Sequence, residues 1–231
     1  MLTDIFSSFD PATSSLFKTL PSPLFWLMNM LFLTTILSTF WLYPSPTSQL
    51  IMFPKQAMNT QVYSTSGTHL KGFSTILSAL FIFIIVLNLT GLFPYVFSST
   101  SHLYFTLSLA LPIWLSLILS SMFNAPSTFL ASILPGGAPD WLNPFLVLVE
   151  TLSIMVRPLT LSFRLAANMS AGHIVLALIG IYSSSAILSS LSSMIMLGAI
   201  QIIYMMFELG ICLIQAYIFC LLLSLYSDDH S

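Results

Sequence analysis

The sequence predicts an all-α integral membrane protein, and three properties of the chain support that fold class. Hydrophobic residues make up 57% of the 231 residues, and the mean hydropathy is +0.97. Charged residues make up 5%, whereas about a quarter of the residues in a soluble domain are charged. Uncharged apolar segments long enough to cross a bilayer as helices recur along the chain. We therefore expect one membrane domain over residues 1–231, with helices satisfying the backbone within the lipid.

Charge and motif content argue against several other classes of protein. The formal net charge is −2 and the chain has no basic run, so nucleic-acid binding is not expected. The sequence contains no nucleophile elbow, phosphate-binding loop or zinc-protease motif. The four histidines are scattered, at positions 69, 102, 173 and 230, and give no basis for haem ligation within the spans. We expect no catalytic site, no metal site and no cofactor.

The N-terminal part of the chain predicts one span followed by a surface segment. Residues 24–43 are uncharged and about 20 residues long, the length that a bilayer core requires. Trp26 and Trp41 lie near their ends, where interfacial aromatic residues are common. Residues 47–71 mix apolar and polar side chains and include Lys55, which is typical of an amphipathic segment lying on the membrane surface.

Two further spans are expected in the middle of the chain. Residues 72–97 are uncharged, and Asn88 is their single amide. An interhelical hydrogen bond or the polarity of a helix end would explain that amide without any function. Residues 103–123 form the next span, in which Pro112 predicts a kink. Residues 124–144 are rich in proline and glycine and form the longest expected break.

The C-terminal part predicts a hairpin of two unusually long helices. Residues 145–182 would extend about 57 Å as one helix, and residues 194–226 about 50 Å. The bilayer core is about 30 Å thick, so helices of this length must be steeply tilted or broken. Pro158 is a possible break, and the serine-rich residues 183–193 are the expected turn.

Charged residues are placed unevenly within this apolar chain. Both arginines lie within residues 150–173. A charge in the middle of a span costs at least about 2.5–3.5 kcal/mol on insertion scales. The three lysines instead lie at or outside the edges of the apolar segments: Lys18, Lys55 and Lys71. This contrast indicates a function for the arginine-bearing segment.

The polar residues of the first long helix fall on one stripe. Glu150, Arg157 and Arg164 are seven residues apart, which places them within about 40° of one another on an ideal helix. Asn168 extends the stripe, because it follows Arg164 by four residues. His173 follows Arg164 by nine residues, which places it half a turn around the helix from Arg164 and about 13 Å farther along the axis.

The second long helix carries a matching polar line. Gln201, Glu208 and Gln215 are also seven residues apart, in a segment whose only charge is Glu208. Two antiparallel helices would therefore each present a polar line in apolar surroundings. That arrangement is expected where water penetrates partway or where a proton is passed.

Each of these residues also has a simpler interpretation. Arg157 and Glu150 are close enough to a helix end to extend towards the interface, and His173 would fit as a packed core side chain. Arg164 is harder to explain in this way, because it lies about seven residues deeper and a guanidinium keeps its charge. It needs an anionic partner, which is either Glu208 or a carboxylate on another subunit.

Several segments carry a resemblance to a known family. They are ETLS (150–153), RLAANMSAGH (164–173) and ELGICLIQAY (208–217), with NLTGLFPY (88–95) and the turn at 134–139 matching in place and order. These segments resemble the subunit a family of rotary F-type ATP synthases, in its mitochondrial form. The resemblance covers nearly the whole chain and is weakest over residues 1–70.

The resemblance implies a fold, a location and partners. The family has one N-terminal span, a surface helix on the matrix side, two further spans and a steeply tilted hairpin lying against the ring of c subunits. It implies a multi-pass protein of the mitochondrial inner membrane, with its N-terminus towards the intermembrane space and its C-terminus towards the matrix. The expected partners are the c-ring, the peripheral stalk, other membrane subunits and the lipid bilayer.

The resemblance also implies roles at the centre of the hairpin. Arg164 matches the family's essential arginine, which faces the ring carboxylates, and Asn168 and Gln215 flank it. The implied function is a proton-translocating stator subunit that forms two offset aqueous half-channels and couples proton flow to ring rotation. Such a subunit has no catalytic site of its own.

The half-channels would involve four further residues. His173 and Glu208 match the pair in the half-channel from the intermembrane space, and Glu150 with Asp229 would line the exit to the matrix. An ideal helix, however, points His173 away from Arg164. Either the helix bends near Gly172, or the two side chains serve separate cavities.

Two other classes of membrane protein compete with this interpretation. A proton-pumping subunit of a respiratory redox complex would be expected to carry buried lysines, and every lysine here is peripheral. A structural anchoring subunit would leave Arg164 unexplained.

Overall fold

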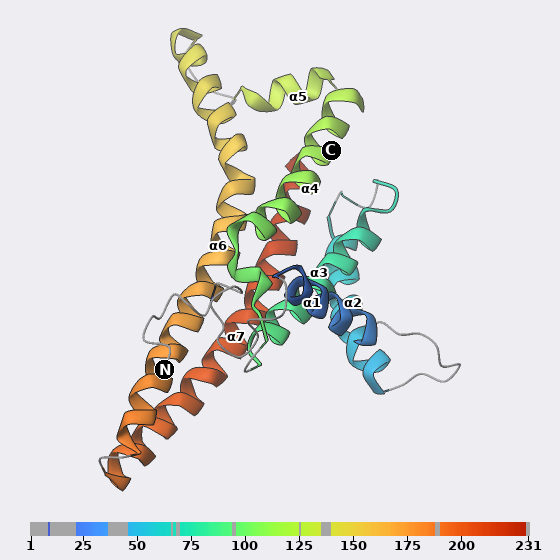
Figure 1. The fold of residues 1–231 in the computed structure, drawn as a ribbon. Helices are drawn as coiled ribbons and strands as arrows, with labels where there is room; N and C mark the ends of the chain where they lie inside the picture. The colour runs from blue at the N-terminus through green and yellow to red at the C-terminus, as the bar shows by residue number, and fades with distance from the viewer. Residues whose placement is uncertain are drawn as a thin grey trace.

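The computed structural model describes residues 9, 22–36, 46–65, 67, 70–93, 96–124, 126–134, 140–187 and 190–229. Their regular structure is helical throughout (Figure 1), in the order α1 (Ser22–Ile36), α2 (Pro46–Tyr63), α3 (Phe73–Gly91), η3 (Ser99–Ser101), α4 (Leu103–Asn124), α5 (Pro126–Ile133), η4 (Asp140–Leu142), α6 (Asn143–Ala186) and α7 (Leu191–Asp229). Within these ranges, four helices are long and apolar enough to cross a membrane, namely α3, α4, α6 and α7. The prediction of an all-α membrane protein is confirmed.

Helices α1, α3 and α4 occupy parts of the three stretches in which spans are expected before the hairpin, with different ends. α1 covers residues 22–36, and the rest of the expected span 24–43 lies outside the described residues. α3 ends at Gly91, before the expected end at residue 97, because the chain approaches a proline that helices rarely reach. α4 continues through Pro112 without interruption.

The break expected at residues 124–144 contains a helix of its own. α5 occupies Pro126–Ile133, and its proline stands at the first helical position, where the missing N–H costs nothing. The turn expected at 134–139 lies mostly outside the described residues. The short helix η4 then leads directly into α6.

The long helices are unbroken. α6 has 44 residues and α7 has 39, which correspond to about 66 Å and 58 Å. Pro158 lies inside α6 and is buried, and the helix continues on both sides of it. Proline is tolerated in membrane helices because neighbouring groups satisfy the freed carbonyl. The possible break at Pro158 does not occur, so α6 must be steeply inclined or extend beyond a bilayer core of about 30 Å.

The hairpin packs with α2, α3 and α4 around the main apolar core. α6 lies against α4 and α7, and α3 lies against α2 and α7 (Figure 1). The core takes buried side chains from most of these helices, among them Leu77, Leu117, Leu161, Phe219 and Leu223. Many large apolar side chains on the outer faces are exposed, as expected for surfaces in contact with lipid.

α1 is tied to the segment between α3 and η3. Asn29 donates a hydrogen bond from Nδ2 to the carbonyl oxygen of Phe97, with the two atoms 2.8 Å apart. The Trp26 ring meets the Phe97 ring edge-on, with 5.6 Å between centroids. These contacts fix one side of α1 on the rest of the molecule.

Candidate functional site

A hydrogen bond joins the two polar lines of the hairpin. Asn168 on α6 donates from Nδ2 to Oε1 of Gln215 on α7, and the atoms are 2.9 Å apart. Gln215 is only 5% exposed, whereas Asn168 lies at the surface of the chain. One turn from this pair, the thiol of Cys212 approaches the sulfur of Met169 at 3.6 Å. The seam between α6 and α7 is therefore closely packed at this level.

Glu208 is the most deeply buried charged residue that the structure describes. It is 2% exposed, and neither carboxylate oxygen has a hydrogen-bond partner among the described residues. Its carboxyl group lies directly against Gly172, so that a Cβ at Gly172 would come within 2.8 Å of Cδ and closer still to Oε1. A buried polar group without a partner costs about 1–3 kcal/mol, and more when it is charged. Such a group inside a membrane protein indicates a functional site.

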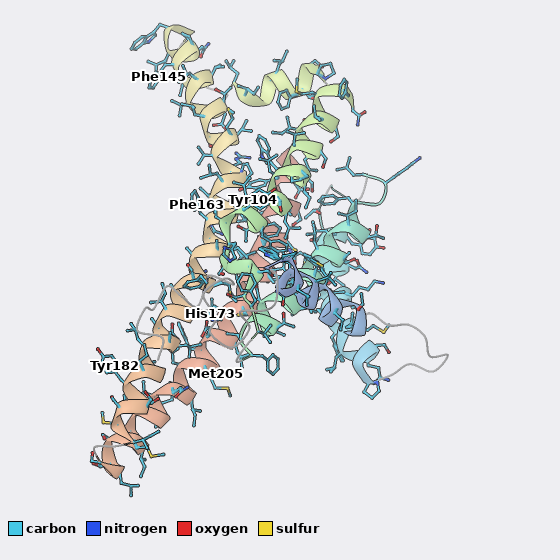
Figure 2. All side chains as sticks on the ribbon, viewed as in Figure 1. Tyr104, Phe145, Phe163, His173, Tyr182 and Met205 are labelled. Atoms are coloured by element: carbon cyan, nitrogen blue, oxygen red, sulfur yellow. The ribbon has the colours of Figure 1, made fainter. Side chains whose placement is uncertain are left out.

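His173 follows Gly172 in the chain, so it is next to the residue that the Glu208 carboxyl group contacts. The ring is half-buried, and its Nε2 atom is buried without a hydrogen-bond partner in the described part of the chain. Phe9 meets the ring edge-on, with centroids 6.4 Å apart. Figure 2 places His173 between Phe163 and Tyr182 along α6. The structure thus brings the predicted pair, His173 and Glu208, to one level of the hairpin.

Arg164 has a different environment. Its side chain is exposed, and no ion pair or hydrogen bond of its guanidinium occurs among the described residues. Glu208 is therefore not its partner in the isolated chain, which leaves a carboxylate on another subunit as the remaining alternative. α6 stays α-helical through Gly172, so no break turns His173 towards Arg164.

Glu150 and Arg157 form an ion pair at the other end of the stripe. Oε1 of Glu150 and Nη2 of Arg157 are 3.6 Å apart, and the side chains are 36% and 25% exposed, respectively. The Arg157 guanidinium also lies over the ring of Tyr226 on α7, 5.0 Å from its centroid. The interpretation of Arg157 as a side chain that simply extends to the interface does not account for these contacts.

Asn88 and Asp229 give less information about the site. Asn88 is 0% exposed, and neither atom of its amide has a hydrogen-bond partner in the described ranges. The interhelical hydrogen bond considered for it is therefore absent there. Asp229 ends α7, and its side chain lies outside the described part of the structure. Within that part, no cluster of His, Cys, Asp and Glu is suited to hold a metal ion.

Two contributors to the site were not identified as such from sequence. Gly172 was named only as the site of a possible bend. Its role in admitting the Glu208 carboxyl group depends on the register of α6 against α7, which brings together two residues 36 positions apart in the chain. Tyr226 was not singled out at all, because a contact between the ends of the hairpin leaves no local pattern. The sequence signal for Gly172 was a small residue close to polar ones, and Tyr226 had no such signal.

Comparison with known proteins places the chain among related sequences. The profile of the family described as ATP synthase A chain matches residues 22–228. The chain is 39% identical to ATP synthase subunit a of Artemia franciscana over 229 residues, which cover 99% of this chain and 100% of that protein. It is 39% identical to ATP synthase subunit a of Locusta migratoria and 41% identical to that of Drosophila simulans, in each case over 234 residues and 99% of both chains.

Proposed function

The chain belongs to the ATP synthase A chain family, and we propose that its two long helices provide the proton path of a rotary ATP synthase. It is the proton-translocating stator subunit of an F-type ATP synthase, a multi-pass protein of the mitochondrial inner membrane. The respiratory redox alternative finds no support, since the family profile extends over nearly the whole chain. The assignment of residues rests mainly on one contrast. Glu208 is buried and Arg164 is exposed, and neither has a hydrogen-bond or ion-pair partner within the described part of the chain.

Entry of the proton is assigned to His173 and Glu208. Both have buried polar atoms without hydrogen-bond partners in the ranges that the structure describes, both are titratable, and Glu208 touches the residue next to His173. A carboxylate and an imidazole at one level can accept a proton from one side and pass it on. These two groups form the half-channel from the intermembrane space, and Asn88 is a further polar group on the neighbouring α3.

Arg164 acts on a carboxylate of the c-ring. Because its side chain is exposed and has no ion pair or hydrogen bond among the described residues, it can face another subunit at the outer surface of α6. At 4 Å and an effective dielectric of 20, its attraction for a ring carboxylate is about 4 kcal/mol. A membrane potential of 100 mV supplies about 2.3 kcal/mol per proton, so the two energies are of comparable size. The fixed charge favours release of the ring proton and prevents protons from leaking directly between the half-channels.

Exit of the proton is assigned to Glu150, with Asp229 at the end of α7. Glu150 is partly exposed near the start of α6, at the end of the hairpin opposite the turn. Asn168 and Gln215 lie between the entry and exit groups and hold the helices together beside Arg164. Two offset half-channels fit the separate environments of Arg164 and His173.

The partners and orientation follow from the same proposal. The c-ring covers the face of α6 that carries Arg164, and the peripheral stalk and other membrane subunits contact the remaining helices. The N-terminus faces the intermembrane space and the C-terminus faces the matrix. α2, with the exposed Lys55, then lies on the matrix surface.

The test is passive and coupled proton flux through the reconstituted membrane sector, comparing wild type with Arg164→Ala. We expect coupled pumping to be lost while passive proton leak is retained or increased. Lys55→Ala, which removes an exposed cation from α2, is the matched control and should behave as wild type. Unchanged coupled transport in Arg164→Ala would show that the arginine is structural and would overturn the proposal.

A further inference from the structure

Arg157 is held from two sides by groups on different helices. Its guanidinium lies 3.6 Å from the Glu150 carboxylate on α6 and 5.0 Å from the centroid of the Tyr226 ring on α7. A cation within about 6 Å of an aromatic centroid is attracted to the face of the ring. The planar guanidinium can stack on a ring and bind a carboxylate at the same time. The three side chains therefore form one cluster, here called the exit cluster.

The geometry of the exit cluster constrains Glu150 more than Arg157. Seven helical residues separate the two, about 10.5 Å along the axis, so the side chains must extend towards each other to meet. Arg157 is anchored independently on Tyr226, and the adjoining Pro158 is buried. The Glu150 carboxylate, in contrast, has no other ion pair in the described residues. Its direction is set by the anchored guanidinium.

We propose that Arg157, anchored on the Tyr226 ring, is a positioning residue that holds the Glu150 carboxylate at the seam between α6 and α7 for proton release. The proposal rests on the assignment of Glu150 to the exit path. A carboxylate in an ion pair accepts a proton only by giving up that pair. The pair therefore shortens the time that a released proton stays on Glu150, and it keeps the carboxylate from turning towards lipid.

The experiment replaces Arg157 in the intact complex and measures proton-driven ATP synthesis in liposomes. Arg157→Met keeps an unbranched side chain that can pack on Tyr226 but removes the charge, whereas Arg157→Lys keeps the charge. We expect Arg157→Met to lower the rate by about three- to tenfold, because it removes the ion pair with Glu150. Arg157→Lys should retain more of the rate than Arg157→Met, because an ammonium still pairs with the carboxylate and is attracted to the ring face, although it cannot stack as a planar group. A purely structural role would give the opposite order, because methionine preserves the apolar packing.

Substitution of the anchoring ring provides an independent arm. Tyr226→Leu should lower the rate about as much as Arg157→Met, because it removes the aromatic face, and Tyr226→Phe should retain most of the rate. Tyr182→Leu, at an exposed tyrosine of α6, is the matched control. Assembly is checked in every variant by copurification of the c-ring.

The outcomes separate this inference from the proposed function. A wild-type rate in Arg157→Met, or an equal loss in Arg157→Lys and Arg157→Met, would overturn the positioning role even if Arg164→Ala abolishes coupling. Coupled pumping by Arg164→Ala would instead overturn the proposed function itself. A loss in Arg157→Met that Arg157→Lys restores, with Tyr226→Leu equally impaired, supports the inference.

Discussion

At the scale of single residues, Gly172 decides whether Glu208 can occupy its site. A Cβ at position 172 would lie closer to the Glu208 carboxyl group than nonbonded atoms approach. The carboxyl group has no hydrogen bond to hold it there among the described residues, so it would be displaced by even a methyl group. Glycine in a helix interior costs about 1 kcal/mol relative to alanine. A glycine at this position is therefore explained by the space that the Glu208 carboxyl group needs.

We therefore expect Gly172→Ala to lower proton-driven ATP synthesis by about tenfold, because it displaces the Glu208 carboxyl group from the proton path; a tenfold loss corresponds to about 1.4 kcal/mol in the activation free energy. The complex should still assemble, because alanine favours the helix. The measurement is ATP synthesis in liposomes under an imposed proton gradient. Gly180→Ala is the control, since a Cβ there meets nothing within 4 Å. Equal rates for the two variants would contradict the role of Gly172.

At the scale of helices, the sequence predicted that the two long C-terminal segments pair, but it did not predict where helices run on without a break. The apolar lengths and the heptad-spaced polar residues predicted a hairpin, and the structure has α6 and α7 side by side. Continuity through Pro158 and the helix α5 were not predictable, because both depend on neighbours that satisfy backbone groups. Contacts such as that of Arg157 with Tyr226 depend on the register of two helices, which local patterns do not encode.

The hydrogen bond between Asn168 and Gln215 should stabilise the hairpin in a way that single and double substitutions distinguish. Asn168→Leu leaves the buried Gln215 amide without its partner, which costs about 1–3 kcal/mol. Asn168→Leu with Gln215→Leu removes both polar groups and should cost less than the single change. Thermal unfolding of the purified subunit complex, followed by aggregation or by c-ring release, measures the order of stability. A double variant less stable than Asn168→Leu would exclude this account.

At the scale of the whole molecule, the number of spans fixes which compartments the two termini face. Four described helices are long enough to span, and an even number would place both termini on one side. α1 has 15 described residues, about 22 Å of helix, and is too short by itself for a core of about 30 Å. The sequence predicts that the span continues to residue 43. With α1 as a fifth span, the termini lie on opposite sides, as the proposed orientation requires.

Labelling of thiols introduced at the two ends tests this parity. Ser7→Cys and Ser231→Cys are made separately, and mitoplasts are treated with a membrane-impermeant maleimide. The native Cys212 and Cys220 are buried and should contribute little background. We expect Ser7→Cys to react in intact mitoplasts and Ser231→Cys only after the inner membrane is permeabilised. Reaction of both thiols before permeabilisation would mean that α1 does not cross the bilayer. With four spans and the N-terminus in the intermembrane space, α6 would begin on that side of the membrane. Glu150 would then face the intermembrane space, and it could not line an exit to the matrix.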